Sequence, residues 1–186
     1  MSEEKTAGLL LHSIPYLGNK KILKVLTPEG LLSFISGKKN LTALTIPFAW
    51  AEWVYSTKNK KEIHPLQDGT ILDDLSILKQ NYATLSIAGQ MAKDLLRTQM
   101  PGKPATEALT LTLACFRKLH LFAEPAILLA AFRLKLLHSE GLIGIEEAPE
   151  FETLLLSRSF IQLASLPKEE KLLYKIDLLF EQRVDC

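Results

Sequence analysis

The stretch that decides the fold of the N-terminal part is KKILKVLTPEGLLSFIS, residues 20–36. Two runs rich in apolar residues, 20–26 and 31–36, flank a segment in which proline and glycine favour a turn. This pattern predicts two strands joined by a turn. Three further runs, each bounded by turn-forming residues, extend the series: 7–14, 46–55 and 62–66. Five short runs at near-regular spacing predict a small β-barrel of the OB type.

The apolar pattern changes after Asp68-Gly69 from alternation to steps of three and four residues, which is typical of helices. A break at Pro101-Gly-Lys-Pro104 separates the first helix from the rest. The predicted helices cover 75–95, 106–119, 126–138, 153–166 and 168–182. The sequence therefore predicts an α+β chain, with a five-stranded barrel domain over 1–69 and an all-α helical domain over 70–186.

Composition and charge exclude several classes of protein. Apolar residues make up 47% of the 186 residues and the net charge is +1, which disagrees with intrinsic disorder. Cys115 and Cys186 are too few for a disulfide-stapled scaffold. The longest uncharged apolar run, 126–132, is far shorter than a membrane span. Because residues 1–5 are acidic where a signal peptide would be basic, we expect a cytoplasmic protein without a membrane segment.

Motifs that would indicate catalysis or a bound group are missing from the sequence. The four histidines are far apart, and no two have the spacing of a metal-binding pair. No glycine-rich phosphate loop and no nucleophile elbow is present. Cys115 lies in an apolar helix pattern, where a buried and unreactive thiol is the usual outcome. We therefore expect no enzyme activity, no cofactor and no metal.

Basic residues concentrate in the N-terminal part. Residues 1–70 carry nine lysines against six acidic residues, whereas residues 71–186 have a net charge of −2. Clusters at strand ends of a small barrel could form one basic groove for single-stranded nucleic acid, with Trp53 or Tyr55 stacking on bases. The alternatives are a solvated lysine surface and aromatic rings that fill the barrel. The candidate phosphate contacts are Lys20, Lys21, Lys24, Lys38, Lys39, Lys58, Lys60 and Lys61.

Four segments, in this order, resemble the bacterial recombination mediator family RecO. Residues 24–39 resemble a block in which T-x-x-x-G-L-L-S runs into a glycine followed by two basic residues, here with two residues rather than three between Thr27 and Gly30. Pro47–Glu52 matches the family's P-F strand, and Phe132–Gly141 matches the helix F-x-L-[RK]-L-L-x-x-x-G. Residues 157–166 resemble the last helical region. Where many members carry a zinc-binding cysteine cluster, this chain has residues 143–149 without cysteine, so it resembles a short form.

The resemblance implies an OB-fold that binds DNA and a helical C-terminal domain. Such proteins bind single- and double-stranded DNA and anneal complementary strands. They also engage the acidic, apolar-ended tail of single-strand-binding protein, and with RecR they help to place the recombinase on coated DNA during repair. The alternative is an adaptor that docks protein tails and whose barrel no longer binds DNA usefully.

A receptor for such a tail needs an apolar pocket rimmed by cations, because cations hold the carboxylates. The helical part carries few basic residues overall, which makes its local basic pairs candidates. Lys135 falls on the basic position of the matched helix, with Arg133 beside it, and Arg117 and Lys118 are in reserve. The alternative is that these cations are solvated at the surface of the helical domain.

Overall fold

The computed structural model describes residues 2–37, 44–57, 62–147 and 149–184. The chain divides into two compact units. The barrel unit consists of residues 1–75 together with 99–109, and the helical unit consists of residues 76–98 together with 110–186. The barrel unit thus takes up a segment that follows the first long helix in the sequence.

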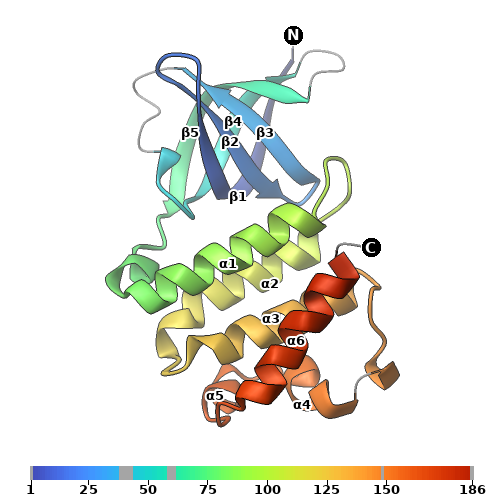
Figure 1. The fold of residues 1–186 in the computed structure, drawn as a ribbon. Helices are drawn as coiled ribbons and strands as arrows, with labels where there is room; N and C mark the ends of the chain where they lie inside the picture. Colours follow the sequence, from blue (N-terminus) through green and yellow to red (C-terminus); the bar gives the residue numbers. More distant parts are fainter. Residues whose placement is uncertain (1, 38–43, 58–61, 148, 185–186) are drawn as a thin grey trace. The chain divides into compact units, whose positions relative to one another are not determined.

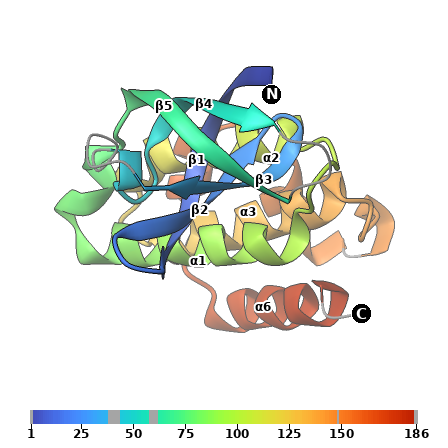
Figure 2. The same ribbon diagram turned by 90° about the horizontal axis from the view of Figure 1, so that it is seen from above.

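Five strands form a closed barrel in the order β1-β2-β3-β5-β4 (Figures 1 and 2). All neighbouring strands are antiparallel except β3 and β5, which pair in parallel. The five predicted strands and the α+β class are confirmed. The strands are β1 (Ser2–Tyr16), β2 (Lys20–Thr27), β3 (Gly30–Ser36), β4 (Trp50–Thr57) and β5 (Ile63–Asp73).

Three of the strands, β1, β4 and β5, have bounds that differ from the sequence prediction. β1 begins at Ser2 rather than residue 7, because its first half pairs with β4 and its second half with β2. β4 begins at Trp50 rather than residue 46, since Phe48 after Pro47 takes a positive φ of 64° that interrupts an extended chain. β5 continues to Asp73, past the predicted boundary at residue 69.

The inside of the barrel is filled by aromatic and aliphatic side chains from all five strands. The ring of Phe34 stacks on Trp53 with centroids 5.7 Å apart and lies 4.9 Å from the ring of Tyr55. Trp53 is fully buried, and its indole Nε1 donates a hydrogen bond of 2.9 Å to the carbonyl oxygen of Gly8. This bond removes the cost of burying the indole N–H. The other main core residues are Leu10, Leu23, Val25, Leu44, Ala51 and Leu66.

The turn between β2 and β3 is clasped by residues 99–109. The backbone N–H of Leu31 donates to the oxygen of Met100 at 3.2 Å, and that of Ala105 donates to the oxygen of Pro28 at 2.9 Å. Gly30 lies between these bonds with a φ of 118°. A Cβ at Gly30 would come within 2.6 Å of the oxygen of Lys103 and 2.7 Å of that of Met100. Only glycine fits this position without moving backbone.

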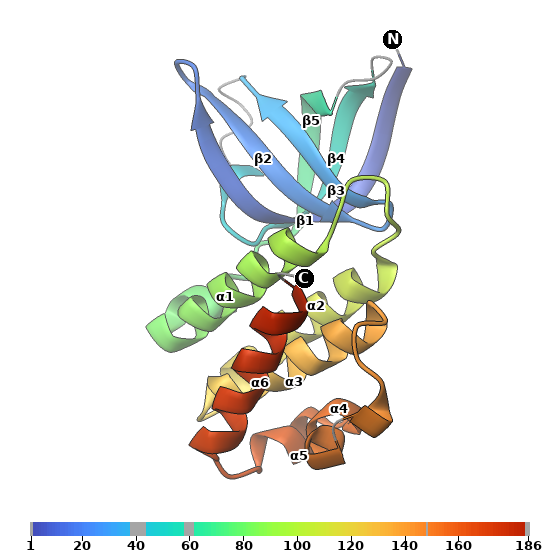
Figure 3. The same ribbon diagram turned by 45° about the vertical axis from the view of Figure 1, so that its right-hand side comes forward.

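The helical unit is built around α3 (Pro125–Ser139), which packs against α1, α4, α5 and α6 (Figure 3). The sequence of α3 is apolar on all sides, which is typical of a helix buried in a core. The other elements are η2 (Ser76–Gln80), α1 (Tyr82–Thr98), α2 (Thr106–Lys118), η3 (Leu119–Leu121), η4 (Ile145–Glu147), η5 (Pro149–Phe151), α4 (Glu152–Leu156), α5 (Phe160–Ala164) and α6 (Glu170–Val184).

The helix predicted over 153–166 is wrong, because the chain forms two short helices, α4 and α5, with a break at 157–159. Ser159 caps α5, and its Oγ accepts a hydrogen bond from the backbone N–H of Gln162 at 3.3 Å. A serine side chain that bonds to the backbone in this way competes with the hydrogen bonds of a continuous helix. Residues 157–159 contain no proline or glycine, so the sequence gives no strong signal of the break. Within the described ranges, no helix combines the length and apolar character of a membrane span.

Replacing Gly30 by alanine should lower the free energy of unfolding by roughly 2 kcal/mol or more, because both the positive φ and the backbone clash oppose a Cβ. Urea denaturation measures the change. Gly18→Ala is the matched control, since Gly18 also has a positive φ, 67°, but no atom within 4 Å of the added Cβ. Equal losses of unfolding free energy in the two variants would contradict the close contact between Gly30 and the backbone of residues 100–103.

Candidate nucleic-acid interface

The three lysines of β2 divide between the two sides of the barrel wall. Leu23 and Val25 point into the core. Because side chains alternate along a strand, Lys21 lies on their side, and Lys20 and Lys24 lie on the outer side. Lys21 Nζ donates to Thr45 Oγ1 at 3.1 Å, at the end of the barrel. Lys24 Nζ donates to Ser33 Oγ at 2.8 Å, across to β3. The lysine cluster predicted on β2 is therefore divided: Lys20 and Lys24 lie on the outer side of the barrel wall, and Lys21 lies on the inner side.

Between the two outward lysines runs a row of apolar side chains that we call the isoleucine row. Ile14, Ile22, Ile35 and Pro65 are paired directly with one another across β1, β2, β3 and β5. Ile14 is 38% exposed, and the other three are half-buried. Leu23 and Phe34, which are adjacent in sequence to Ile22 and Ile35, point into the core. Because side chains alternate along a strand, the isoleucine row therefore faces away from the core.

A cation lies on each side of the isoleucine row. On one side Lys24 pairs with Ser33 and with His12 across the neighbouring strands. On the other side Lys20 pairs with Tyr16, whose ring is 43% exposed. We call the surface formed by these two flanks and the isoleucine row the outer face. It combines positive charge, an exposed aromatic ring and an apolar floor on adjacent strands.

The stacking role predicted for Trp53 and Tyr55 is wrong, because both side chains lie inside the barrel. Trp53 has no exposed surface and Tyr55 is 8% exposed. The hydroxyl of Tyr55 donates to the carboxylate of Glu4 at 3.1 Å. Burial, reinforced by that carboxylate, raises the pKa of Tyr55 to about 12. Neither ring presents a face to a base, and the alternative that the aromatic residues fill the core is the correct one.

Sequence reasoning missed the aromatic residue that is exposed. Tyr16 stands at the end of β1, next to a turn, and only the cross-strand register places its ring beside Lys20. Strict alternation along β2 would have separated Lys20 and Lys24 from Lys21. The remaining candidate lysines lie outside the described residues and stay predictions: Lys38, Lys39, Lys58, Lys60 and Lys61.

In the helical unit, the predicted tail contact Arg133 is wrong, because this side chain is buried and doubly paired. Its Nε lies 2.7 Å from Asp94 Oδ2, and its Nη1 lies 2.6 Å from Asp177 Oδ1. The guanidinium also lies over the ring of Phe180, 5.0 Å from the centroid. Arg133 therefore ties α3 to α1 and α6, and its charge is already neutralised inside the protein.

Lys135 lines a narrow apolar slot between α2, α3 and α5. Its Nζ donates to the carbonyl oxygens of Leu155 and Ser157, at 2.5 and 2.8 Å. Burial, together with the charge of Arg158, lowers the pKa of Lys135. Burial also raises the pKa of the Cys115 thiol, which lines the slot, to about 12, and this makes the thiol unreactive at neutral pH. The other lining residues are Leu111, Leu128, Ala131, Phe132, Phe160 and Leu163.

One further cation lines this slot, and another lies beyond it on α2. Arg158 lines it directly and is exposed. Lys118 is exposed at the end of α2, on the helix face that carries Leu111 and Cys115, since residues 111, 115 and 118 follow helical spacing. Arg117 is also exposed but lies one residue off that face. Of the four predicted tail contacts, Lys135 is the one among the residues that line the slot, and Arg133 is paired with carboxylates elsewhere.

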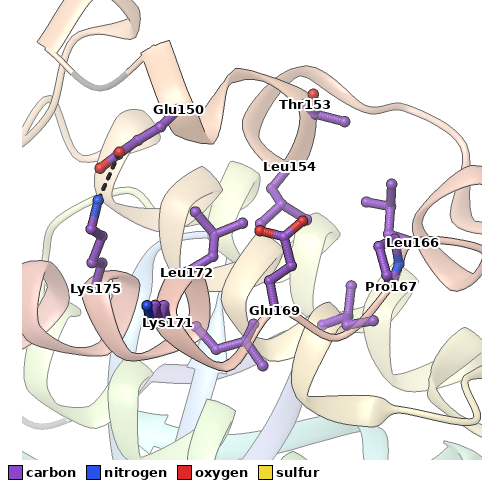
Figure 4. Close-up of a pocket in the computed structure, with 11 residues that line it drawn as sticks. Glu150, Thr153, Leu154, Leu166, Pro167, Glu169, Lys171, Leu172 and Lys175 are labelled. Carbon is purple, nitrogen blue, oxygen red and sulfur yellow. Dashed lines mark hydrogen bonds and ion pairs between the residues drawn. The ribbon is translucent and has the colours of Figure 1, made fainter.

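A second hollow lies between α4 and the start of α6, and Leu154 and Leu172 are among the residues that line it (Figure 4). The ammonium of Lys175 lies 2.9 Å from the carboxylate of Glu150, so this cation is already paired. Glu169 and Lys171 add one charge of each sign to the rim. With two acidic and two basic residues, this hollow has no net charge with which to attract an acidic tail.

The sequence of this chain is similar to those of two curated proteins. No protein-family model matches the chain. It is 29% identical over 147 residues to a protein named DNA repair protein RecO from Chlamydia pneumoniae, which covers 76% of this chain. It is 26% identical over 148 residues to the protein of the same name from Chlamydia muridarum, again over 76% of this chain. The chain spans 58% and 62% of the lengths of these two curated relatives.

Replacing Arg133 by alanine should lower the free energy of unfolding by about 3 kcal/mol or more, because it leaves the carboxylate of Asp94, 2% exposed, buried without its partner. Thermal or urea denaturation followed by circular dichroism measures the loss. Arg158→Ala removes an exposed arginine and should change stability by about 0.5 kcal/mol at most. A variant at Arg133 as stable as wild type would contradict the structural role.

Proposed function

The chain belongs to the RecO family of DNA repair proteins, and from this premise we propose that it is a DNA-binding recombination mediator. In this role it binds single- and double-stranded DNA, anneals complementary strands, and, together with RecR, helps to load the recombinase on coated DNA. The relatives' name supports the repair role. The geometry of the barrel supports the mode of DNA binding.

The barrel is of the OB type in this proposal. Two features support the assignment: five strands in the order β1-β2-β3-β5-β4, and closure by a parallel pairing of β3 with β5. OB-folds bind oligonucleotides on the face formed by strands 2 and 3. In this chain that face carries Lys20 and Lys24 on β2, with Ser33 and Ile35 on β3.

The observation that carries the proposal is the pair of outward lysines on the outer face. Lys20 is exposed, and Lys24 is half-buried. Ammonium groups along a strand neutralise phosphates and release counterions, and this favours binding regardless of base sequence. Neutralised strands repel each other less, so two complementary strands approach more easily and anneal. Lysines at 38–39 and 58–61 are further proposed phosphate contacts.

The slot beside Lys135 is the proposed receptor for the tail of single-strand-binding protein. Its floor is apolar, and the charges that line it are positive, from Lys135 and Arg158. We propose that Lys118, exposed further along the same face of α2, adds a third positive charge. An acidic segment ending in an apolar residue is complementary to both properties. The second hollow, with its balanced charges, lacks this complementarity.

A second candidate function is an adaptor that docks protein tails through this slot without useful DNA binding. The net charge of +1 favours it, since proteins that bind DNA mainly through phosphates are usually strongly basic. The hydrogen bond from Lys24 to Ser33 also favours it, because a phosphate must compete for that ammonium. The salt dependence of oligonucleotide binding separates the two functions.

The double variant Lys20→Ala, Lys24→Ala should bind a single-stranded oligonucleotide more weakly than wild type. It should also flatten the plot of log affinity against log salt by about 1.4, because each phosphate contact on a single strand contributes about 0.7. Fluorescence anisotropy at several salt concentrations measures both quantities. Lys21→Ala, on the opposite side of the same strand, is the control and should leave the slope nearly unchanged. An unchanged slope in the double variant would place the groove elsewhere.

For the tail receptor, the double variant Lys118→Ala, Arg158→Ala should bind a labelled acidic peptide that ends in a large apolar residue roughly tenfold more weakly, since two exposed cations are lost. Lys135 is left intact because its hydrogen bonds support the backbone at 155–157. Lys171→Ala, Lys175→Ala at the second hollow is the control. Weaker binding in the control alone would move the receptor to that hollow.

A further inference from the structure

A hollow opens on the outer face next to the ring of Tyr16. It is lined by one aromatic residue, four aliphatic residues or prolines, and one carboxylate, namely Tyr16, Ile22, Ile35, Ile63, Pro65 and Glu62. Tyr16 is 43% exposed and Ile63 is 39% exposed, so water contacts much of this apolar surface. Three of the four apolar residues lie on adjacent strands in register, which gives the hollow a fixed floor.

The hollow has the properties of a site for a flat, apolar-faced ring. Nucleic-acid bases stack on exposed aromatic rings, and the faces of bases are the least polar part of a single strand. Trp53 and Tyr55 are buried and Trp50 is half-buried, so among the described aromatic residues of the barrel Tyr16 has the largest exposed fraction. The ring of Tyr16 would stack on the face of one unstacked base, and an edge of that base would rest on the isoleucine floor.

The two lysines next to the hollow are placed to contact phosphates of a single strand that carries such a base. Lys20 pairs directly with Tyr16, and Lys24 lies four residues further along the same strand, roughly 13 Å away. The isoleucine row lies between the two lysines. Because roughly 13 Å corresponds to about two nucleotide steps of an extended strand, a single strand that runs along β2 with one phosphate near each ammonium has two bases between these phosphates, and one of them can lie at the hollow.

Glu62 makes the hollow selective. Its carboxylate is exposed and lies on the rim, on the side of β5 rather than of β2. It repels phosphate, which keeps the backbone on the lysine side. It is also an acceptor only, so it can bind the exocyclic amino group of cytosine, adenine or guanine. Thymine has no exocyclic amino group, and its single ring donor, N3–H, lies between two carbonyl acceptors that a carboxylate repels.

We propose that this hollow holds one unstacked base of a bound single strand, with Tyr16 as the stacking residue and Glu62 as the acceptor for an exocyclic amino group. The inference rests on the proposed DNA binding and adds a base preference to it. Phosphate contacts alone give affinity without preference, whereas the hollow favours an amino-bearing base over thymine at one position.

The test compares oligo-dC with oligo-dT of equal length by fluorescence anisotropy at low salt and pH 8, using the full chain. Wild type should bind oligo-dC about fivefold more tightly, since one hydrogen bond to a charged acceptor distinguishes the two bases. Tyr16→Ala should weaken binding of both oligonucleotides fivefold or more through lost stacking. Leu17→Ala removes a neighbouring side chain that is 74% exposed and outside the hollow, and it should bind like wild type.

Glu62→Gln should reduce the preference for oligo-dC to nearly one, since the amide can both donate and accept. Glu52→Gln is the matched control, because it removes the same charge from the barrel outside the hollow and should keep the preference. Equal binding of the two oligonucleotides by wild type, or an unchanged affinity in Tyr16→Ala, would overturn the base site. Absence of any binding by wild type at low salt would instead overturn the proposed DNA binding itself.

Discussion

Barrel closure depends on a short parallel ladder between β3 and β5, formed by Ser33–Ile63, Phe34–His64 and Ile35–Pro65. The middle pair directs Phe34 into the core, where it meets Trp53 and Tyr55. The pair next to it directs Ile35 and Pro65 outward. A slip of one residue would exchange these two sets, exposing an aromatic core residue and burying the outer row. The same register that fills the barrel therefore also builds the surface on which a nucleic acid could lie.

The sequence was sufficient for the five strands and for most of the helices, because alternation and helical spacing are local patterns. It was insufficient wherever a residue's partner lies far along the chain. The partners of Arg133, Asp94 and Asp177, are 39 and 44 residues away, so an arginine in an apolar helix resembled a binding residue. The break at 157–159 has no proline or glycine, and a serine cap produces it instead.

The outer face shows the same division between local and long-range information. Alternation separates Lys20 and Lys24 from Lys21, and this could have been read from β2 alone. The exposed ring of Tyr16 and the carboxylate of Glu62 come together only through the successive pairing of β1 with β2, β2 with β3 and β3 with β5. Aromatic content drew attention to β4, but a small barrel needs its largest rings inside, where they remove the most apolar surface from water.

The clasp at Gly30 has a consequence for synthesis of the chain on the ribosome. β5 ends at Asp73, yet the backbone partners of Pro28 and Leu31 are Ala105 and Met100. All five strands are therefore translated before the residues that complete the β2–β3 turn. At roughly 5–20 residues per second, the nascent barrel waits a few seconds with those two backbone groups bonded to water. During that interval the chain of α1 is made, so the barrel reaches its final bonding only after the first long helix has emerged.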